Sequence, residues 1–215
     1  MAIVIINPNS TKAMTDAMVE VARGANPRYE FVGWTSAKGP PSIEGAADGA
    51  LAAPPLLDLV QKASSEGAEG IMIGCFDDTG LQKAAEHAKC AVIGIGQASY
   101  HYAALRQWRF SVVTTLSVSV PVLEANIRGA GLANRLARVR ASDVPVLDLE
   151  RRPEASGRKI LAEATISAAE DEVDAIILGC AGMVKVVEEV SDALDIAVID
   201  PIVCAARCMA WLVPK

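Results

Sequence analysis

Short apolar runs rich in β-branched residues alternate along the chain with longer segments in which apolar residues recur at helical spacing. The short runs predict strands at Ile3–Ile6, Glu30–Trp34, Gly70–Ile73, Ala91–Ile95, Phe110–Thr114, Arg138–Arg140, Ala175–Leu178 and Ile196–Ile199. The longer segments predict helices at Lys12–Arg23, Leu56–Ser65, Leu81–Ala88, Ser99–Gln107, Ser117–Gly129, Glu154–Glu170, Val184–Leu194 and Pro201–Trp211. Because strands and helices alternate from one end to the other, we expect an α/β fold with mostly parallel sheets flanked by helices.

The two halves of the chain repeat one another around two cysteines. An apolar run ends in Gly74-Cys75 in the first half, and another ends in Gly179-Cys180 in the second. The two cysteines are separated by about half of the 215 residues. Each is followed by a helical pattern and then by a further apolar run, Ala91-Val92-Ile93 or Ala197-Val198-Ile199, which keeps nearly the same offset. Upstream, Ile3–Pro8 resembles Ser111–Thr115 at a similar offset. The alternative is a generic α/β chain whose strands all look alike, but three repeated elements in one order favour an internal duplication.

A duplication of this kind predicts two pseudo-symmetric lobes. We expect an N-terminal lobe over residues 1–105 that carries Cys75, and a C-terminal lobe over residues 106–215 that carries Cys180. The C-terminal helix can pack back on the first lobe. Ligands of open α/β sheets bind beyond the carboxyl ends of the strands, so we expect both thiols, and the active site, in the cleft between the lobes.

Two thiols that face each other across a cleft can remove a proton from one side of a carbon and return one to the other side. That is the chemistry of a racemase. We expect the backbone N–H groups after Cys75 and Cys180, at the start of a helix, to lower the thiol pKa and to hold a developing oxyanion. Free cysteine is also among the most buried residue types, so either thiol alone favours core packing. The matched pair favours catalysis.

Composition narrows the classes of partner. The net charge is −6 and the lysines and arginines are scattered, which argues against nucleic acid or an anionic membrane as a partner. No apolar run approaches the roughly 20 residues of a membrane span, and the first residues lack the basic region of a signal peptide. We therefore expect a small-molecule substrate.

The cysteines and glycines outside the repeat do not predict a cofactor. Five cysteines without regular spacing do not suggest a disulfide framework, and a reducing cytoplasm would keep them as thiols, so we expect a cytoplasmic protein. Cys204 and Cys208 lie four residues apart without a histidine nearby to complete a metal site, which favours core packing. Gly94-Ile95-Gly96 lacks the third glycine of a dinucleotide-binding fingerprint. We expect neither a metal nor an organic cofactor.

Polar residues follow the first strand of each half. Asn7, Asn9 and Ser10 lie directly after the first predicted strand, where their side chains can cap the next helix or contact a substrate. Thr114 and Thr115 occupy the matching place in the second half and have the same two interpretations.

Two further segments carry candidate binding residues. The turn-rich loop Gly39–Gly45, which contains Ser42, either closes over the cleft or is an ordinary surface loop. Asp77 and Asp78 follow Cys75 and can cap the next helix or orient an N–H group of a substrate. Both aspartates would oppose an anionic substrate near Cys75, which favours a neutral or cationic one.

The segments Gly74–Leu81 and Leu178–Met183 resemble the paired signatures of the aspartate/glutamate racemase superfamily. Within it the chain resembles the hydantoin racemases, including the allantoin racemases. The segments Ile6–Thr11, Gly39–Gly45, Phe110–Leu116 and Val144–Leu147 also resemble that branch, so the similarity covers nearly the whole chain.

This resemblance implies cofactor-independent racemisation by a homo-oligomer, with Cys75 and Cys180 as two alternating proton-transfer groups. Amino-acid racemases of the superfamily tend to carry Asn-Thr and Thr-His after the two cysteines, where this chain has Phe76-Asp77 and Ala181-Gly182. The difference disfavours aspartate or glutamate as substrate and fits a neutral cyclic ureide. We expect the backbone N–H groups of these four residues to stabilise the enolate.

Three alternatives remain open at this point. The nearest is an amino-acid racemase of the aspartate/glutamate type. Maleate isomerase or arylmalonate decarboxylase activity is more distant, since the decarboxylases keep one of the two cysteines. The third is a non-catalytic binding module that kept the cleft, for which a matched pair of thiols has no purpose.

Overall fold

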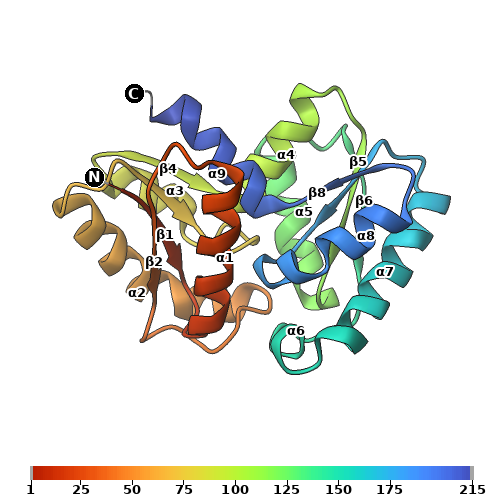
Figure 1. Cartoon of the computed structure of the whole chain (residues 1–215), viewed down its shortest axis with the longest axis horizontal. Helices are drawn as coiled ribbons and strands as arrows, with labels where there is room; N and C mark the ends of the chain where they lie inside the picture. Colours follow the sequence, from red (N-terminus) through yellow and green to blue (C-terminus); the bar gives the residue numbers. More distant parts are fainter. Residues whose placement is uncertain (1, 214–215) are drawn as a thin grey trace.

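The structure is a computed structural model that describes residues 2–213. Two four-stranded parallel sheets lie side by side, each flanked by helices (Figure 1). The first sheet has the order β2-β1-β3-β4, with β1 at Ile3–Asn7, β2 at Phe31–Thr35, β3 at Gly70–Ile73 and β4 at Ala91–Gly94. The second has the order β6-β5-β7-β8, with β5 at Phe110–Thr114, β6 at Leu136–Ala141, β7 at Ala175–Leu178 and β8 at Ala197–Ile199. The two orders are equivalent strand for strand, which confirms the predicted pseudo-symmetric α/β fold.

The helices of the first lobe are α1 (Lys12–Ala25), α2 (Ala46–Ser65), α3 (Leu81–His87) and α4 (Ile95–Leu105). Those that follow are α5 (Val120–Gly129), α6 (Asp148–Arg151), α7 (Pro153–Glu170), α8 (Val187–Ala193) and α9 (Pro201–Leu212). Two 3₁₀ turns, η1 (Ser117–Ser119) and η2 (Ala181–Lys185), precede α5 and α8. None of the helices in residues 2–213 is both long enough and apolar enough to cross a membrane.

Local chemistry explains where α9 begins but is misleading for α2. The Asp200 carboxylate caps α9 by accepting the N–H groups of Ile202 and Val203, and Pro201 occupies the first helical position. The predicted start of α2 at Leu56 is wrong, because the helix begins at Ala46 and carries Pro54 and Pro55 inside it. Proline more often marks the first turn of a helix, so the pair is a misleading signal in the sequence.

The helix α4 also begins earlier than predicted, directly after β4. The N–H of Gly96, in the first turn of α4, donates to the carboxylate of Asp78 over 3.1 Å. An acceptor from an earlier segment of the chain thus satisfies an N–H group in the first turn of α4, which no pattern within the helix itself indicates.

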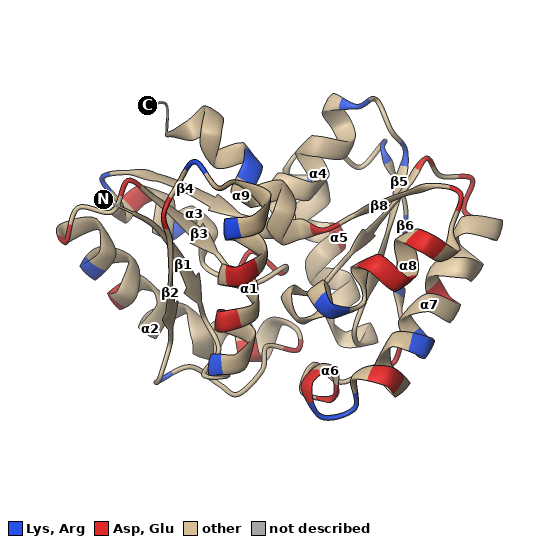
Figure 2. Cartoon of the chain, viewed as in Figure 1, with Lys and Arg blue, Asp and Glu red and all other residues tan. Residues whose placement is uncertain are grey.

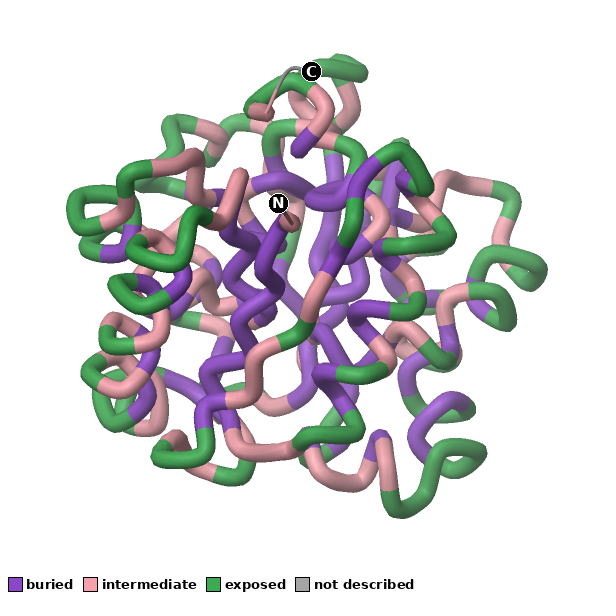
Figure 3. The backbone as a smooth tube through the Cα atoms, turned by 60° about the vertical axis from the view of Figure 1, so that its left-hand side comes forward, coloured by how far each residue is buried: buried purple, intermediate pink, exposed green. Residues whose placement is uncertain are grey.

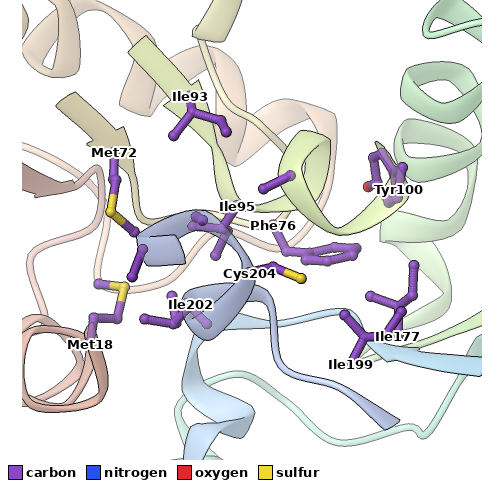
Figure 4. Packing of buried hydrophobic residues seen from close by; sticks show 14 of the residues in the cluster. Met18, Met72, Phe76, Ile93, Ile95, Tyr100, Ile177, Ile199, Ile202 and Cys204 are labelled. Atoms are coloured by element: carbon purple, nitrogen blue, oxygen red, sulfur yellow. The ribbon is translucent and has the colours of Figure 1, made fainter. Parts of the chain in front are cut away.

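The helices α4 and α9 lie between the two lobes. The C-terminal helix α9 contacts α1 and α4 in the first lobe, and Figure 1 shows it reaching across from the second sheet. One hydrophobic cluster includes Met72 of the first sheet and Ile177 of the second, with Ile95 of α4 and Ile202 of α9 among them (Figure 4). Each lobe also has a smaller cluster on the outer face of its sheet. The buried residues therefore lie mainly in the interior of the molecule, with exposed segments around them (Figure 3).

Candidate active site

The two cysteines line one small cavity between the lobes. Most of its lining residues follow the two central strands of each sheet, β1 and β3 in the first lobe and β5 and β7 in the second. The lining residues are Asn9, Met14, Ile43, Gly74, Cys75, Phe76, Asp77, Thr115, Val146, Gly179, Cys180, Ala181 and Gly182. Both thiols follow equivalent strands, and they approach the cavity from opposite lobes.

The structure brings together six of the ten predicted binding residues. Asn9, Phe76, Asp77, Thr115, Ala181 and Gly182 line the cavity beside the cysteines, whereas Asn7, Ser10, Ser42 and Thr114 do not. The side chain of Asn7 donates to Asn9 and Thr15, and that of Thr114 donates to the carbonyl of Gly179 over 3.1 Å. Asn7 and Thr114 thus organise the two turns that carry cavity residues.

The loop Gly39–Gly45 closes one side of the cavity. Ile43 lines it, and the neighbouring Glu44 carboxylate accepts the backbone N–H of Val146, in the other lobe, over 2.8 Å. The loop is anchored to its own lobe by Thr11, whose hydroxyl donates to the carbonyl of Pro41 over 2.7 Å. A second link between the lobes joins the side-chain amide of Asn126 on α5 to the carbonyl of Asp77 over 2.8 Å.

The cavity is nearly filled in this conformation. Its volume is about 30 Å³, which accommodates one or two water molecules, whereas sites for small organic ligands usually measure about 300 Å³ or more. A ring-sized ligand therefore requires the cavity to open. The hydrogen bond between Val146 and Glu44 lies at the side of the cavity that the loop Gly39–Gly45 closes.

Burial dominates the electrostatics of the thiols. It raises the pKa of Cys75 far above the ordinary thiol value and the pKa of Cys180 to about 12, and the charge of Asp77 adds to both shifts. Backbone N–H groups of Asp77, for Cys75, and of Gly182 and Met183, for Cys180, oppose the rise. The predicted lowering of the thiol pKa is therefore wrong for the closed site, because desolvation outweighs these hydrogen bonds.

The two aspartates after Cys75 have different surroundings. Burial raises the pKa of Asp77 to about 7 against a hydrogen bond from the N–H of Gly45, and the carboxylate oxygen Oδ2 is buried without a hydrogen-bond partner. Burial raises the pKa of Asp78 to about 8, but that carboxylate accepts the backbone N–H groups of Gln97 and Gly96. Asp78 thus caps α4, while Asp77 has an unused acceptor.

Sequence reasoning missed one residue beside the Cys75 thiol and several that line the cavity. Thr79, whose hydroxyl lies 3.4 Å from the Cys75 sulfur, stands in the segment already singled out, and its distance of four residues from the cysteine is the signal that could have found it. Met14, Ile43 and Val146 carry no chemical signature of their own. The ring of Phe76 packs edge-on against Tyr100, with ring centroids 5.4 Å apart, and belongs largely to the central hydrophobic cluster (Figure 4).

A family model described as Asp/Glu/Hydantoin racemase matches residues 3–209. The chain belongs to this family. It is 40% identical over 208 residues to a hydantoin racemase of Rhizobium meliloti, an alignment that covers 96% of this chain and 86% of the relative. Racemases are isomerases, so this member of the racemase family is an enzyme of the isomerase class.

Two solved structures support the same family assignment. The family member described here superposes on an allantoin racemase from Klebsiella pneumoniae with a TM-score of 0.93 and 33% identity, covering 99% of this chain and 87% of that one. An allantoin racemase from Pseudomonas fluorescens gives the same TM-score and identity, with 99% of this chain and 91% of that chain covered.

Proposed function

We propose that this racemase interconverts the enantiomers of 5-substituted hydantoins, of the allantoin type or with alkyl or aryl substituents, without a cofactor. The observation that carries the proposal is the shared cavity, which two thiols line from opposite lobes. The similarity to hydantoin and allantoin racemases supports the same substrate class. In a 5-substituted hydantoin the stereogenic carbon lies between a ring nitrogen and a carbonyl, so loss of its proton gives an enolate.

The proposed reaction transfers protons between the ring carbon and the two sulfurs. One cysteine, as thiolate, removes the proton, and the other, as thiol, delivers one to the opposite face; the roles exchange for the other enantiomer. The N–H groups of Asp77 and Gly182 point to the two sulfurs and stabilise the thiolates. We assign the enolate oxygen to the N–H groups of Phe76 and Ala181, with Asn9 and Thr115 as further contacts.

The charge of the cavity favours a neutral substrate. Lysine, arginine and histidine are absent from the described residues that line it, whereas Asp77 is present. A free carboxylate, as in aspartate or glutamate, would enter this cavity without a counter-ion and beside a carboxyl group, which is costly in a buried site. A cyclic ureide instead offers N–H groups to the unpartnered oxygen of Asp77.

Polarimetry or circular dichroism on single enantiomers tests the proposal. Allantoin, 5-benzylhydantoin, 5-isobutylhydantoin, L-aspartate and L-glutamate are incubated with the purified enzyme and a reductant, without added cofactor. We expect the signal of at least one hydantoin to decay well above its spontaneous rate. Decay on an amino acid alone would move the enzyme to the amino-acid branch and refute the substrate assignment.

Asp77→Asn should reduce the preference of the enzyme for a hydantoin with a free ring N–H over its N-methylated form. We expect wild-type kcat/KM to fall at least about 10-fold when the ring nitrogen that faces Asp77 is methylated, because a buried acceptor then lacks its donor. The neutral amide of the variant can turn either its NH2 group or its oxygen toward the ring and leaves no charged acceptor unpaired, so the difference should be about 3-fold or less. Comparing the N1-methyl and N3-methyl forms of 5-benzylhydantoin identifies the nitrogen concerned.

The same variant has a predicted pH effect. The charge of Asp77 raises the pKa of both thiols, so its removal should lower both and shift the acid limb of the kcat/KM profile to lower pH. Asp58→Asn, on the exposed side of α2, is the control and should change neither the profile nor the discrimination. Equal loss of activity on methylated and unmethylated substrates would contradict the assigned role.

We also propose that the enzyme works in the cytoplasm as a homo-oligomer. Five cysteines are free thiols, and Leu105, Trp211 and Leu212 expose large apolar side chains near one another on α4 and α9, at the rim of one apolar pocket. Charged residues of both signs are interspersed over both lobes (Figure 2). Analytical ultracentrifugation of the purified enzyme measures its oligomeric state, and a monomer at micromolar concentration would refute the proposed homo-oligomer.

A further inference from the structure

The two thiols do not have equivalent surroundings. The sulfur of Cys75 lies 3.4 Å from the hydroxyl oxygen of Thr79, four residues further along the chain. The residue four positions after Cys180 is Val184, which has no hydrogen-bonding side chain. The duplication therefore keeps both thiols but provides a side-chain hydroxyl at only one of these two positions.

The fold holds Thr79 beside the sulfur. The N–H of Asp78 donates to the carbonyl of Cys75 over 3.0 Å, which closes a turn between the cysteine and the threonine. Gly80, with a φ of 67°, then lets the chain enter α3. Thr79 is 7% exposed, and a Cβ at Gly49 of α2 would stand 3.8 Å from its hydroxyl, so α2 covers it. The hydroxyl is thus packed in place.

A hydroxyl at this position can serve either state of the thiol. It can accept the S–H of Cys75, and after a rotation of its own hydrogen it can donate to the thiolate. The described residues that line the cavity supply no cation, and the charges of Asp77 and Cys180 disfavour a thiolate at Cys75. The hydroxyl of Thr79 and the N–H of Asp77 are the donors that oppose this effect.

We infer that Thr79 is a positioning residue for Cys75, which orients the sulfur toward the cavity and stabilises its thiolate by donating a hydrogen bond. For the racemisation this role rests on the proposed function. The two enantiomers have equal free energies in solution, and they react through the same transition states in opposite directions. For every variant, kcat/KM must therefore be the same in the two directions. Loss of the Thr79 hydroxyl therefore slows both directions to the same extent, although it touches only one thiol.

Alkylation of the thiols tests the inference without a substrate. The wild type and the variants Thr79→Val, Thr79→Ala and Thr79→Ser are treated with iodoacetamide at one pH of about 8, and the rate of modification is followed by mass spectrometry of tryptic peptides. Because this pH lies below the raised pKa of both thiols, each rate is proportional to the fraction of that cysteine present as thiolate. Trypsin places Cys75 in the peptide 63–83 and Cys180 in the peptide 160–185, each as the one cysteine of its peptide. Cys180 thus serves as a control within the same sample.

We expect Thr79→Val and Thr79→Ala to slow the alkylation of Cys75 about 10-fold and to leave that of Cys180 nearly unchanged. Thr79→Ser, which keeps the hydroxyl, should restore the wild-type rate. In racemisation assays kcat/KM should fall about 10- to 100-fold in both directions for the valine and alanine variants, and stay within about 3-fold for serine.

The outcomes separate the two proposals. An unchanged rate of Cys75 alkylation in folded valine and alanine variants, or an equal change of rate at both cysteines, would overturn the role of Thr79. A slower alkylation confined to Cys75 in an enzyme that racemises none of the candidate substrates would support Thr79 and refute the proposed function instead. The variants' folding is checked by circular dichroism, and two replacements of different size guard against a packing defect in either one.

Discussion

Replacement of either Cys75 or Cys180 by serine is expected to lower the rate of hydantoin racemisation by about 10³-fold or more. A serine hydroxyl is far less acidic than a thiol and does not form the anion that removes the proton. Both cysteines line the cavity, and each serves as base for one enantiomer in the proposed mechanism. Polarimetry on both enantiomers measures the loss, with Cys90→Ser as the control, since Cys90 lies directly before β4 and outside the cavity.

Deuterium exchange shows which face each thiol serves. A variant with one remaining cysteine can still remove and return a proton on a single face, so Cys180→Ser should exchange the ring proton of one enantiomer with solvent, and Cys75→Ser that of the other. Nuclear magnetic resonance follows the loss of the proton signal in D₂O. Full racemisation by either serine variant would refute the mechanism in which both thiols transfer protons.

The second large effect is expected on stability, at a charged cluster in the second lobe. Arg140 on β6 donates to both carboxylate oxygens of Asp171 over 2.7 Å, and it also contacts Glu163 and Glu170. The side chains of Arg140 and Asp171 are only 8% and 3% exposed. Arg140→Met should therefore lower the free energy of unfolding by about 3–5 kcal/mol, because it leaves a buried carboxylate without its cation.

Urea unfolding of matched variants measures this effect. Arg138→Met is the control: its guanidinium lies 3.8 Å from the same carboxylate, but its side chain is 59% exposed. An exposed pair of this kind contributes roughly 0–1 kcal/mol, so the control should change little. A similar loss in the free energy of unfolding of the two variants would show that burial of the Arg140–Asp171 pair does not determine its contribution to stability.

The same cluster predicts how stability depends on pH. Burial disfavours the charge of Asp171, but hydrogen bonds from Arg140, Ser111 and Ser167 outweigh it and hold the pKa of that carboxyl below its usual value. A carboxyl with a lowered folded-state pKa contributes stability above its unfolded value of about 3.9 and loses it as the pH falls further. Arg140→Met should therefore show a shallower loss of stability below about pH 4 than the wild type.

The sequence was a better guide to the strands than to the helix starts. Every predicted strand lies within two residues of the observed one, because buried parallel strands are continuous apolar runs. The starts of α2 and α4 were misplaced, since α2 contains Pro54 and Pro55 and α4 is capped by Asp78 from another segment. An acceptor supplied by tertiary structure leaves no local signal.

The same division applies to the site. The internal repeat was enough to predict that Cys75 and Cys180 meet, because equivalent strands of a duplicated fold end at equivalent places. Contacts between segments far apart in the chain, such as Glu44 with Val146, could not be predicted. The expected thiol pKa was wrong for a related reason, since the backbone N–H groups are a local feature whereas burial depends on the whole fold.

The position of α4 and α9 between the lobes also bears on how such a duplicated chain can evolve. The last helix of the first half and the last helix of the second half belong to one hydrophobic cluster with strands of both sheets. Separating the halves after Leu105 would leave the apolar faces of both helices, and the inner faces of both sheets, in water. Neither half therefore retains a complete core of its own, and an ancestral half-length chain with this architecture would have needed a second copy to fold.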